Sequence, residues 1–205
     1  MIIGLTGGIA SGKSTAAALL GDWGAHVIDA DKLGHRAYLQ GTAAFAQVVE
    51  TFGSGVVGDD GEINRAALGA EVFGDTNRLD ELTAIVWPAI RAMAQDEIAG
   101  VQARDPAQVV VLEAAVLIEA GWQDLVDQVW VVTVDPEVAI TRASARDGID
   151  AAAVQARIDA QLSNAERCQG ADQVIDNSAT LTELTASLEA LWQQLSATTH
   201  SSSNS

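Results

Sequence analysis

The stretch Gly7–Ser14 carries the most chemistry in this chain, because it matches G-x-x-x-x-G-K-[ST], the phosphate-binding P-loop. An apolar run that ends at Leu5 precedes it, and a helical pattern follows from Ser14. A strand that leads through glycines into a helix directs backbone N–H groups and the positive end of the helix dipole at one point. Lys13 adds a mobile, exposed cation for the outer phosphates, and the Ser14 hydroxyl can ligate Mg²⁺. The flanking strand and helix argue against a chance glycine-rich turn.

Two carboxylates, Asp29 and Asp31, follow the second apolar run of the chain. In an open parallel sheet, ligands bind at the carboxyl ends of the strands, so both should emerge beside the P-loop. A carboxylate there can orient or deprotonate an acceptor hydroxyl, or organise water around Mg²⁺. The alternative is that these are ordinary strand-end or helix-capping aspartates, and position alone does not separate the two interpretations.

Four arginines gather between residues 142 and 167, which is notable in so acidic a chain: Arg142, Arg146, Arg157 and Arg167. The first two are four residues apart and share a helix face, where two guanidiniums could hold phosphates as a lid closes. The alternative is salt bridging with nearby aspartates, namely Asp147, Asp150 or Asp159. Two further acidic residues, Glu113 at the end of the third strand and Glu119, are interpreted as structural rather than chemical.

Five short apolar runs are expected to be the buried parallel strands that position these groups. They are Ile2–Leu5, His26–Asp29, Val109–Leu112, Val129–Val134 and Gln173–Asp176. Helical patterns separate them, which predicts a doubly wound α/β sheet. Asp135 and Pro136 mark one helix start, and Asp150 is expected to cap a helix that runs to about Arg167. A leucine stripe from Leu181 to Leu195 predicts the last helix.

The second and third strands are separated by roughly eighty residues, far more than one crossover helix needs. We therefore expect an inserted helical lobe at about 32–104, with breaks at Gly41, around 53–61 and at Pro88. The core is then 1–31 and 105–195, within one domain that spans 1–195, and the lid is about 142–167. The insert is either a second-substrate lobe or a purely structural insertion. The polar tail 196–205 should be disordered.

Composition limits the function further. The net charge of -17 argues against a nucleic-acid binder, although the acidity could reflect a salt-rich habitat or only a soluble surface. Cys168 is the only cysteine, so no intrachain disulfide can form. The sequence shows no leader pattern and no apolar run near the ~20 residues of a membrane span. A cytoplasmic protein with small-molecule partners is expected, monomeric or weakly oligomeric.

The chain resembles the dephospho-coenzyme A kinase family over roughly residues 2–195. The resemblance rests on Leu5–Thr15 and Val27–Asp31, on Asn64–Leu68 and Val72–Phe73 in the insert, and on Val116–Glu119. It also rests on a C-terminal signature of Gln161, Arg167, Ala171–Asp172 and Val174–Asn177. It implies a P-loop nucleoside-monophosphate-kinase-like fold with an acceptor lobe and a lid. The implied reaction is ATP-dependent phosphorylation of the ribose 3′-hydroxyl of dephospho-CoA, the last step of coenzyme A synthesis, with Mg²⁺.

The resemblance also implies roles for individual residues. Asp31 matches the catalytic carboxylate, Arg142 a lid arginine that meets ATP phosphates, and Asn177 the segment near the adenine. With Lys13 they complete the expected catalytic and ATP-binding set, whose loop members are Gly8, Ile9, Ala10, Ser11, Gly12, Ser14 and Thr15, with Ser14 as the metal ligand. The chain departs from the family pattern at Trp87, where His is usual, and at Ala114–Ala115, where a Pro is usual.

Two other functions compete with this interpretation. One is a P-loop kinase for another small acceptor such as a nucleoside monophosphate, but a phosphate acceptor would be repelled by Asp29 and Asp31. The other is a GTP-binding switch protein, which would need an Asn-Lys-x-Asp motif that this sequence lacks.

Overall fold

The computed structural model describes residues 1–202, with side chains to residue 195. The chain divides into two compact units. Residues 1–28 and the chain from residue 100 onward form the first, here called the core unit, and residues 29–99 form the second, the helical unit. Within the described residues, no helix is long and apolar enough to cross a membrane.

One five-stranded sheet organises the core unit, with the strand order β2-β3-β1-β4-β5. The strands are β1 (Ile2–Gly7), β2 (His26–Asp29), β3 (Val110–Glu113), β4 (Gln128–Thr133) and β5 (Gln173–Asp176). The pairings of β1 with β3 and β4, and of β4 with β5, are parallel, so these strands end at one edge. The five predicted strands and the doubly wound α/β architecture are confirmed.

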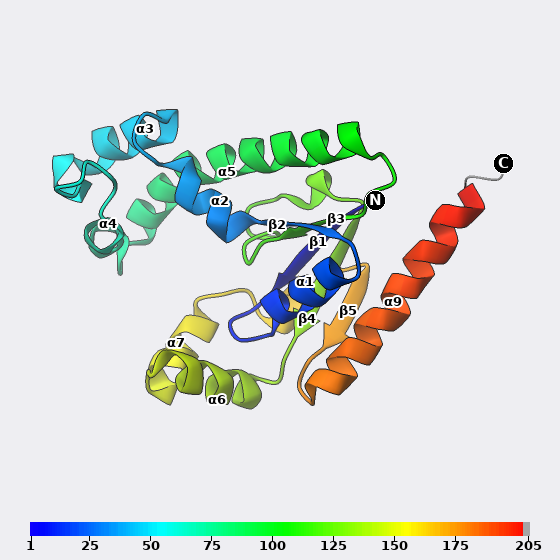
Figure 1. Cartoon of the computed structure of the whole chain (residues 1–205). Helices are drawn as coiled ribbons and strands as arrows, with labels where there is room; N and C mark the ends of the chain where they lie inside the picture. Colours follow the sequence, from blue (N-terminus) through cyan, green and yellow to red (C-terminus); the bar gives the residue numbers. More distant parts are fainter. Residues whose placement is uncertain (203–205) are drawn as a thin grey trace. The chain divides into compact units, whose positions relative to one another are not determined.

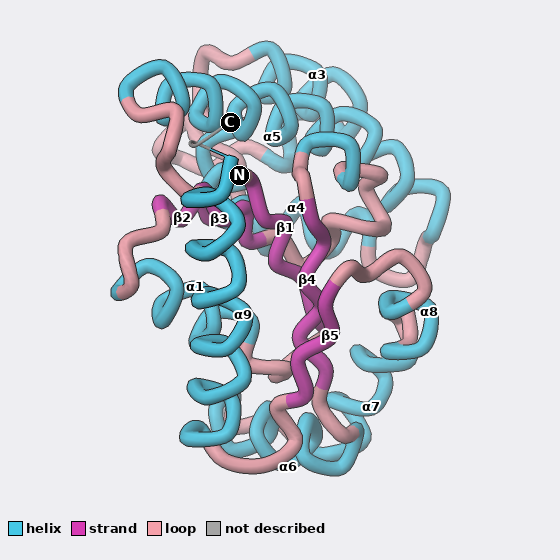
Figure 2. Tube along the Cα trace, turned by 90° about the vertical axis from the view of Figure 1, so that its right-hand side faces the viewer, coloured by secondary structure: helices cyan, strands magenta, loops and turns pink. Residues whose placement is uncertain are grey.

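Helices α1 and α9 cover one face of this sheet and run side by side in Figure 2. They span Lys13–Asp22 and Leu181–Ser202. Strand side chains two residues apart point to the same face. On this face they pack against the apolar sides of both helices, and the cluster comprises Ile3, Leu5, Ala16, Ala17, Leu20, Val111, Trp130, Val132, Ile175, Leu184, Leu188 and Leu195. This burial fixes the start of α1, and with it the P-loop, against β1.

The C-terminal helix extends further than the sequence analysis expected. The predicted disordered tail began at residue 196, but α9 continues to Ser202. A helix that is already nucleated adds residues at little cost, so a polar segment can extend one that packing has fixed. The remainder of that prediction, at residues 203–205, lies outside the described residues.

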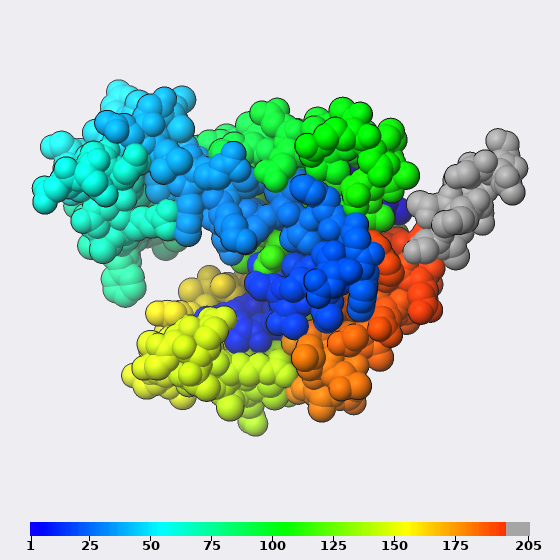
Figure 3. All heavy atoms as spheres, in the orientation of Figure 1, coloured from blue at the N-terminus to red at the C-terminus, as the bar shows by residue number. Residues whose placement is uncertain are grey.

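Three helices follow β4. They are α6 (Pro136–Asp147), α7 (Ala151–Asp159) and α8 (Asn164–Cys168), and α6 and α7 pack together as a projection that is yellow in Figure 3. Asp135 and Asp150 cap α6 and α7 as predicted. The expectation of one helix from Asp150 to about Arg167 is wrong. Ser163 and Glu166 form a capping box that starts α8 separately, because Ser and Glu at this spacing satisfy both free N–H groups.

The helical unit consists of α2 (Ala30–Ala37), α3 (Ala43–Phe52), α4 (Arg65–Val72) and most of α5 (Thr76–Arg104), with a short 3₁₀ turn at Ser54–Val56 (Figure 1). A second 3₁₀ turn, Gln123–Leu125, belongs to the core unit. The predicted breaks at Gly41 and around 53–61 are present. The predicted break at Pro88 is wrong, since α5 continues through it. Pro88 is exposed, while buried Val86 and Ile90 lie on either side of it and offset its missing hydrogen bond.

Candidate active site

The predicted strand–loop–helix arrangement is present at the P-loop. Gly7 ends β1, and a side chain there would lie 2.5 Å from the carbonyl oxygen of Val132, so only glycine fits. Gly12 precedes α1 with a φ of 91°, a left-handed conformation that glycine adopts without strain. No described side chain caps the N-terminus of α1. Its first N–H groups are therefore open to an anion.

Lys13 and Ser14 share one carboxylate partner. The Lys13 Nζ and the Ser14 hydroxyl each donate a hydrogen bond of 2.6 Å to Oε1 of Glu113, at the end of β3. Lys13 is only 9% exposed and Glu113 only 6%, which corrects the expectation of an exposed lysine. Charge pairing makes such burial tolerable. Glu113 is thus part of the site that sequence reasoning underrated, although an acidic residue ending the strand beside β1 was a usable signal.

Asn177 contacts the P-loop at Ser11 and Gly12. Its side-chain Nδ2 donates to the carbonyl oxygen of Ser11 at 2.8 Å, and its backbone N–H donates to Thr133. A Cβ added to Gly12 would come within 2.1 Å of the same Nδ2. The expectation placed Asn177 near an adenine. The structure shows its side chain holding the P-loop, and the place of its segment beside an adenine stays a prediction.

Arg142 extends from α6 to the segment after β5. Its guanidinium donates to the carbonyl oxygens of Asn177 at 2.7 Å and Ala179 at 3.1 Å. None of the aspartates weighed for it is among these partners. Arg142 therefore connects α6, where the predicted lid begins, to the loop that carries Asn177. The two acceptors of these hydrogen bonds are backbone carbonyl oxygens.

The other predicted lid arginines form ion pairs. Arg146 donates two hydrogen bonds to Asp147, at 2.7 and 2.9 Å, and Arg157 lies 4.0 Å from the same carboxylate. The side-chain hydrogen bond from Arg146 holds the pKa of Asp147 below its ordinary value. The salt-bridge alternative therefore describes these two residues in this structure.

Asp29 and Asp31, which belong to the helical unit, have different surroundings. Oδ1 of Asp29 accepts hydrogen bonds from the backbone N–H groups of Asp31 and Lys32, at 3.0 and 3.1 Å, and so caps α2. Partial burial raises the Asp29 pKa, but these hydrogen bonds and the Lys32 charge outweigh it and hold the pKa below its ordinary value. The Asp31 side chain is exposed, and its carboxylate accepts no hydrogen bond from a described residue.

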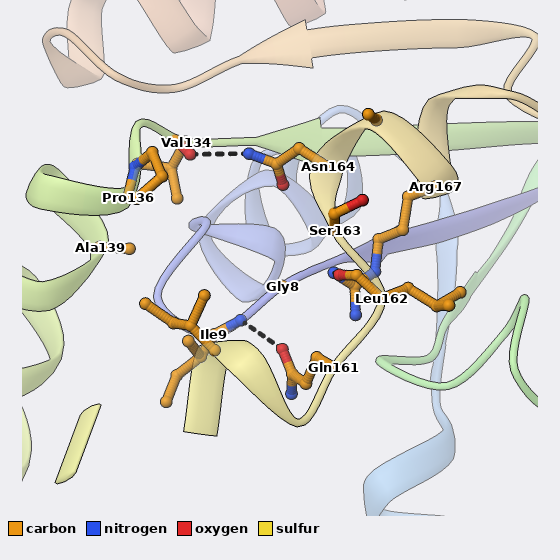
Figure 4. A pocket seen from close by; sticks show the side chains of 12 residues that line it. Gly8, Ile9, Val134, Pro136, Ala139, Gln161, Leu162, Ser163, Asn164 and Arg167 are labelled. Carbon is orange, nitrogen blue, oxygen red and sulfur yellow. Dashed lines mark hydrogen bonds between the residues drawn. The ribbon is translucent and has the colours of Figure 1, made fainter. Parts of the chain in front are cut away.

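A pocket of about 280 Å³ adjoins the first half of the P-loop in the core unit. Its walls come from α6, α7, the α7–α8 segment and α8, and Figure 4 shows Gln161 pointing to Ile9 across it. Arg167, only 2% exposed, closes one side and pairs with Glu119 at 2.9 Å. Sequence reasoning noted Gln161 and Arg167 as signature residues but gave Gln161 no role.

A P-loop at the carboxyl edge of a parallel sheet, whose Lys and Ser share an acidic partner, defines the chain as a P-loop nucleotide-binding protein. A family model described as dephospho-CoA kinase matches residues 1–183. The chain is 46% identical to dephospho-CoA kinase of Symbiobacterium thermophilum over 192 residues, covering 94% of this chain and 80% of the relative. For the enzyme of Geobacter sulfurreducens the identity is 46% over 191 residues, with 93% and 96% covered. The chain belongs to the dephospho-CoA kinase family.

Solved structures share the fold of the chain. A Thermus thermophilus protein of 36% sequence identity superposes with a TM-score of 0.79, over 95% of this chain and 97% of that one. Dephospho-CoA kinase from Campylobacter jejuni, at 22% identity and a TM-score of 0.62, shares the fold over 94% of this chain and 96% of its own. Membership of the dephospho-CoA kinase family makes the chain an ATP-dependent transferase that phosphorylates dephospho-CoA at its 3′-hydroxyl, the final step of coenzyme A biosynthesis. The comparisons give no support to a nucleoside monophosphate acceptor.

Proposed function

We propose that residues Gly8–Thr15 hold the phosphates of ATP, with the backbone N–H groups and the Lys13 ammonium as donors. The support is geometric: the N-terminus of α1 has no side-chain cap, and glycine at positions 7 and 12 allows the backbone to adopt the loop. Lys13 Nζ donates to Glu113 in this structure, so it must rotate toward the ligand in order to pair with a phosphate. Fixed N–H groups and a nearby cation stabilise a transferring phosphoryl group mainly by positioning and charge.

The oxygen atoms of Ser14 and Glu113 fit a Mg²⁺ site. Magnesium prefers oxygen ligands and usually retains several waters beside one or two carboxylates and the substrate phosphates. The Ser14 hydroxyl and the Glu113 carboxylate lie 2.6 Å apart, so Ser14 would ligate the ion and Glu113 would orient its water shell. Bound there, Mg²⁺ would neutralise charge on the phosphates during transfer.

Asp31 is proposed as the carboxylate that orients and deprotonates the 3′-hydroxyl, in a helical unit that binds the acceptor. The observation that carries this proposal is the difference between the two aspartates: the Asp29 carboxylate is used as a helix cap, whereas that of Asp31 is exposed. A general base needs an accessible oxygen that is not already paired. Oδ1 of Asp29 caps α2 and its Oδ2 lies 3.2 Å from Lys32 Nζ, so Asp31 meets the requirement better. The match of Asp31 to the family's catalytic carboxylate supports the same choice.

Arg142 and Asn177 complete the proposed nucleotide site. Arg142 holds the loop after β5 in place, and its remaining N–H groups are available to the phosphates as the lid closes. Asn177 connects that loop to the P-loop and so places the segment that would face the adenine. We extend the proposal to a cytoplasmic location, because the free thiol of Cys168 fits a reducing compartment. A monomeric or weakly oligomeric state is proposed with it.

A matched pair of variants tests the catalytic assignment. Release of ADP is measured for the parent enzyme, Asp31→Asn and Asp29→Asn with dephospho-CoA, and for the parent with AMP, CMP and shikimate. We expect turnover only with dephospho-CoA, and a kcat for Asp31→Asn lower by ~10²-fold or more, the range of general-base contributions. Asp29→Asn should retain most of kcat, because an amide oxygen still caps a helix. Raising Mg²⁺ should not rescue Asp31→Asn. An Asp31→Asn enzyme with most of its kcat would refute the role.

A further inference from the structure

The Gln161 side chain fixes one peptide of the P-loop from outside the loop. Its Oε1 accepts a hydrogen bond of 3.1 Å from the backbone N–H of Ile9, drawn as a dashed line in Figure 4. Gln161 lies on the four-residue segment between α7 and α8, and is far from Ile9 in the sequence. Ile9 is the third residue of the motif, so this contact sets the orientation of the peptide that joins Gly8 and Ile9.

The segment that carries Gln161 is itself held firmly. Arg167 donates to the carbonyl oxygen of Leu162 and to Glu119, which leaves its charge paired although it is almost fully buried. The Asn164 side chain donates to the carbonyl oxygen of Val134 at 2.9 Å (Figure 4). The contacts at Leu162 and Asn164 lie in the turn that begins α8, immediately after Gln161. Because the backbone of this turn is already fixed, the hydrogen bond of Gln161 costs side-chain entropy but no further backbone entropy.

The Arg167 guanidinium also lies next to Gly8, in the first half of the P-loop. A Cβ added to Gly8 would come 3.2 Å from Nη1 of Arg167 and 3.6 Å from Oε1 of Gln161. The Gly8–Ile9 peptide therefore lies against the buried Arg167 side chain and is hydrogen-bonded to Gln161. The second half of the loop is held separately, through the Asn177 contact to Ser11. Two amide side chains from different segments thus hold the two halves of one loop.

We propose that Gln161 is a positioning residue for phosphoryl transfer: it fixes the Gly8–Ile9 peptide of the P-loop and ties the α7–α8 segment to that loop. The inference rests on the proposed role of the P-loop in holding ATP. A misaligned peptide would misplace N–H groups around the transferring phosphoryl group, and such groups act only when correctly aimed. The effect should therefore appear in the use of ATP and not in acceptor binding.

The test compares Gln161→Met, which keeps the length of the side chain but removes the acceptor, with Gln155→Met. Gln155 is the matched control, because it is an exposed glutamine of α7 whose side chain, among the described residues, hydrogen-bonds to Asp159 and not to the P-loop. For Gln161→Met we expect kcat/KM for ATP to fall about tenfold, the scale of one lost hydrogen bond, with KM for dephospho-CoA unchanged within about twofold. The melting temperatures of both variants should match the parent.

A second measurement follows the contact itself. The backbone ¹⁵N–¹H resonance of Ile9 should shift in Gln161→Met and return toward the parent position in Gln161→Glu, which restores an acceptor oxygen. Parent-like ATP kinetics in Gln161→Met, or a lower melting temperature without a kinetic effect, would overturn the inference. Activity that also survived Lys13→Met would instead refute the role of the P-loop itself, so the two failures are distinguishable.

Discussion

Asn177 Nδ2 donates a hydrogen bond of 2.8 Å to the carbonyl oxygen of Ser11, a residue 166 positions away in the chain. The amide is 7% exposed, and its backbone N–H continues the ladder through Thr133 on β4. Because Arg142 donates to the Asn177 carbonyl oxygen, one residue connects the P-loop, the sheet and α6. Asn177 is therefore expected to determine the conformation of the P-loop as well as the stability of the segment after β5.

Removing the Asn177 amide should impair both properties. Asn177→Ala leaves the Ser11 carbonyl oxygen without this partner, so we expect the free energy of unfolding to fall by ~1–2 kcal/mol, the cost of one unsatisfied buried group. KM for ATP should rise more than KM for dephospho-CoA. Urea unfolding and steady-state kinetics measure the two effects. A stability loss with unchanged ATP kinetics would show that Asn177 does not shape the nucleotide site.

Variants of the Lys13–Glu113 pair distinguish the effect of a buried unpaired charge on stability from the effect of the lysine on turnover. Lys13→Met leaves the Glu113 carboxylate buried, with the Ser14 hydroxyl as its remaining hydrogen-bond partner among the described side chains, and breaking a buried pair costs ~3 kcal/mol. Turnover should be lost as well. The double variant Lys13→Met with Glu113→Gln removes the unpaired charge, so its stability should return toward that of the parent while turnover stays absent. Recovery of activity in the double variant would contradict the proposed role of the lysine.

Asp29 should make stability depend on pH through its cap of α2. Its pKa in the folded chain is below the ordinary value of about 4, so its stabilisation is fully present above that value. The stabilisation is lost as the pH falls through the lowered pKa, because the folded state then takes up the proton. Asp29→Asn still caps the helix but does not titrate. The difference in urea-unfolding free energy between parent and variant should therefore shrink from pH 7 toward pH 3, and a constant difference would contradict this account.

Arg142 should influence the nucleotide site through the loop after β5. Arg142→Ala removes two hydrogen bonds to backbone carbonyl oxygens, and we expect kcat/KM for ATP to fall by ~10-fold or more. Arg104→Ala is the matched control, since Arg104 is exposed in the last turn of α5. Arg142→Ala kinetics indistinguishable from those of the control would show that the loop tolerates the loss.

The sequence by itself determined the sheet, the P-loop and the family. Buried parallel strands appear as short apolar runs, and a glycine-rich turn between a strand and a helix has a fixed local geometry, so both can be predicted without long-range information. The caps at Asp135 and Asp150 were predictable for the same local reason. Pro88 shows the limit of local rules, because burial of Val86 and Ile90 on either side keeps α5 helical through it.

Only the tertiary structure decided which partners the functional residues have. The contacts of Lys13 with Glu113, Asn177 with Ser11 and Gln161 with Ile9 join residues about 100 or more positions apart. Side-chain reach and burial set such contacts, and no periodicity in the sequence records them. The structure likewise separated Asp29 from Asp31, since one carboxylate is held by N–H groups of α2 and the other is exposed. Residue types defined the chemistry available, and packing determined which groups are free to perform it.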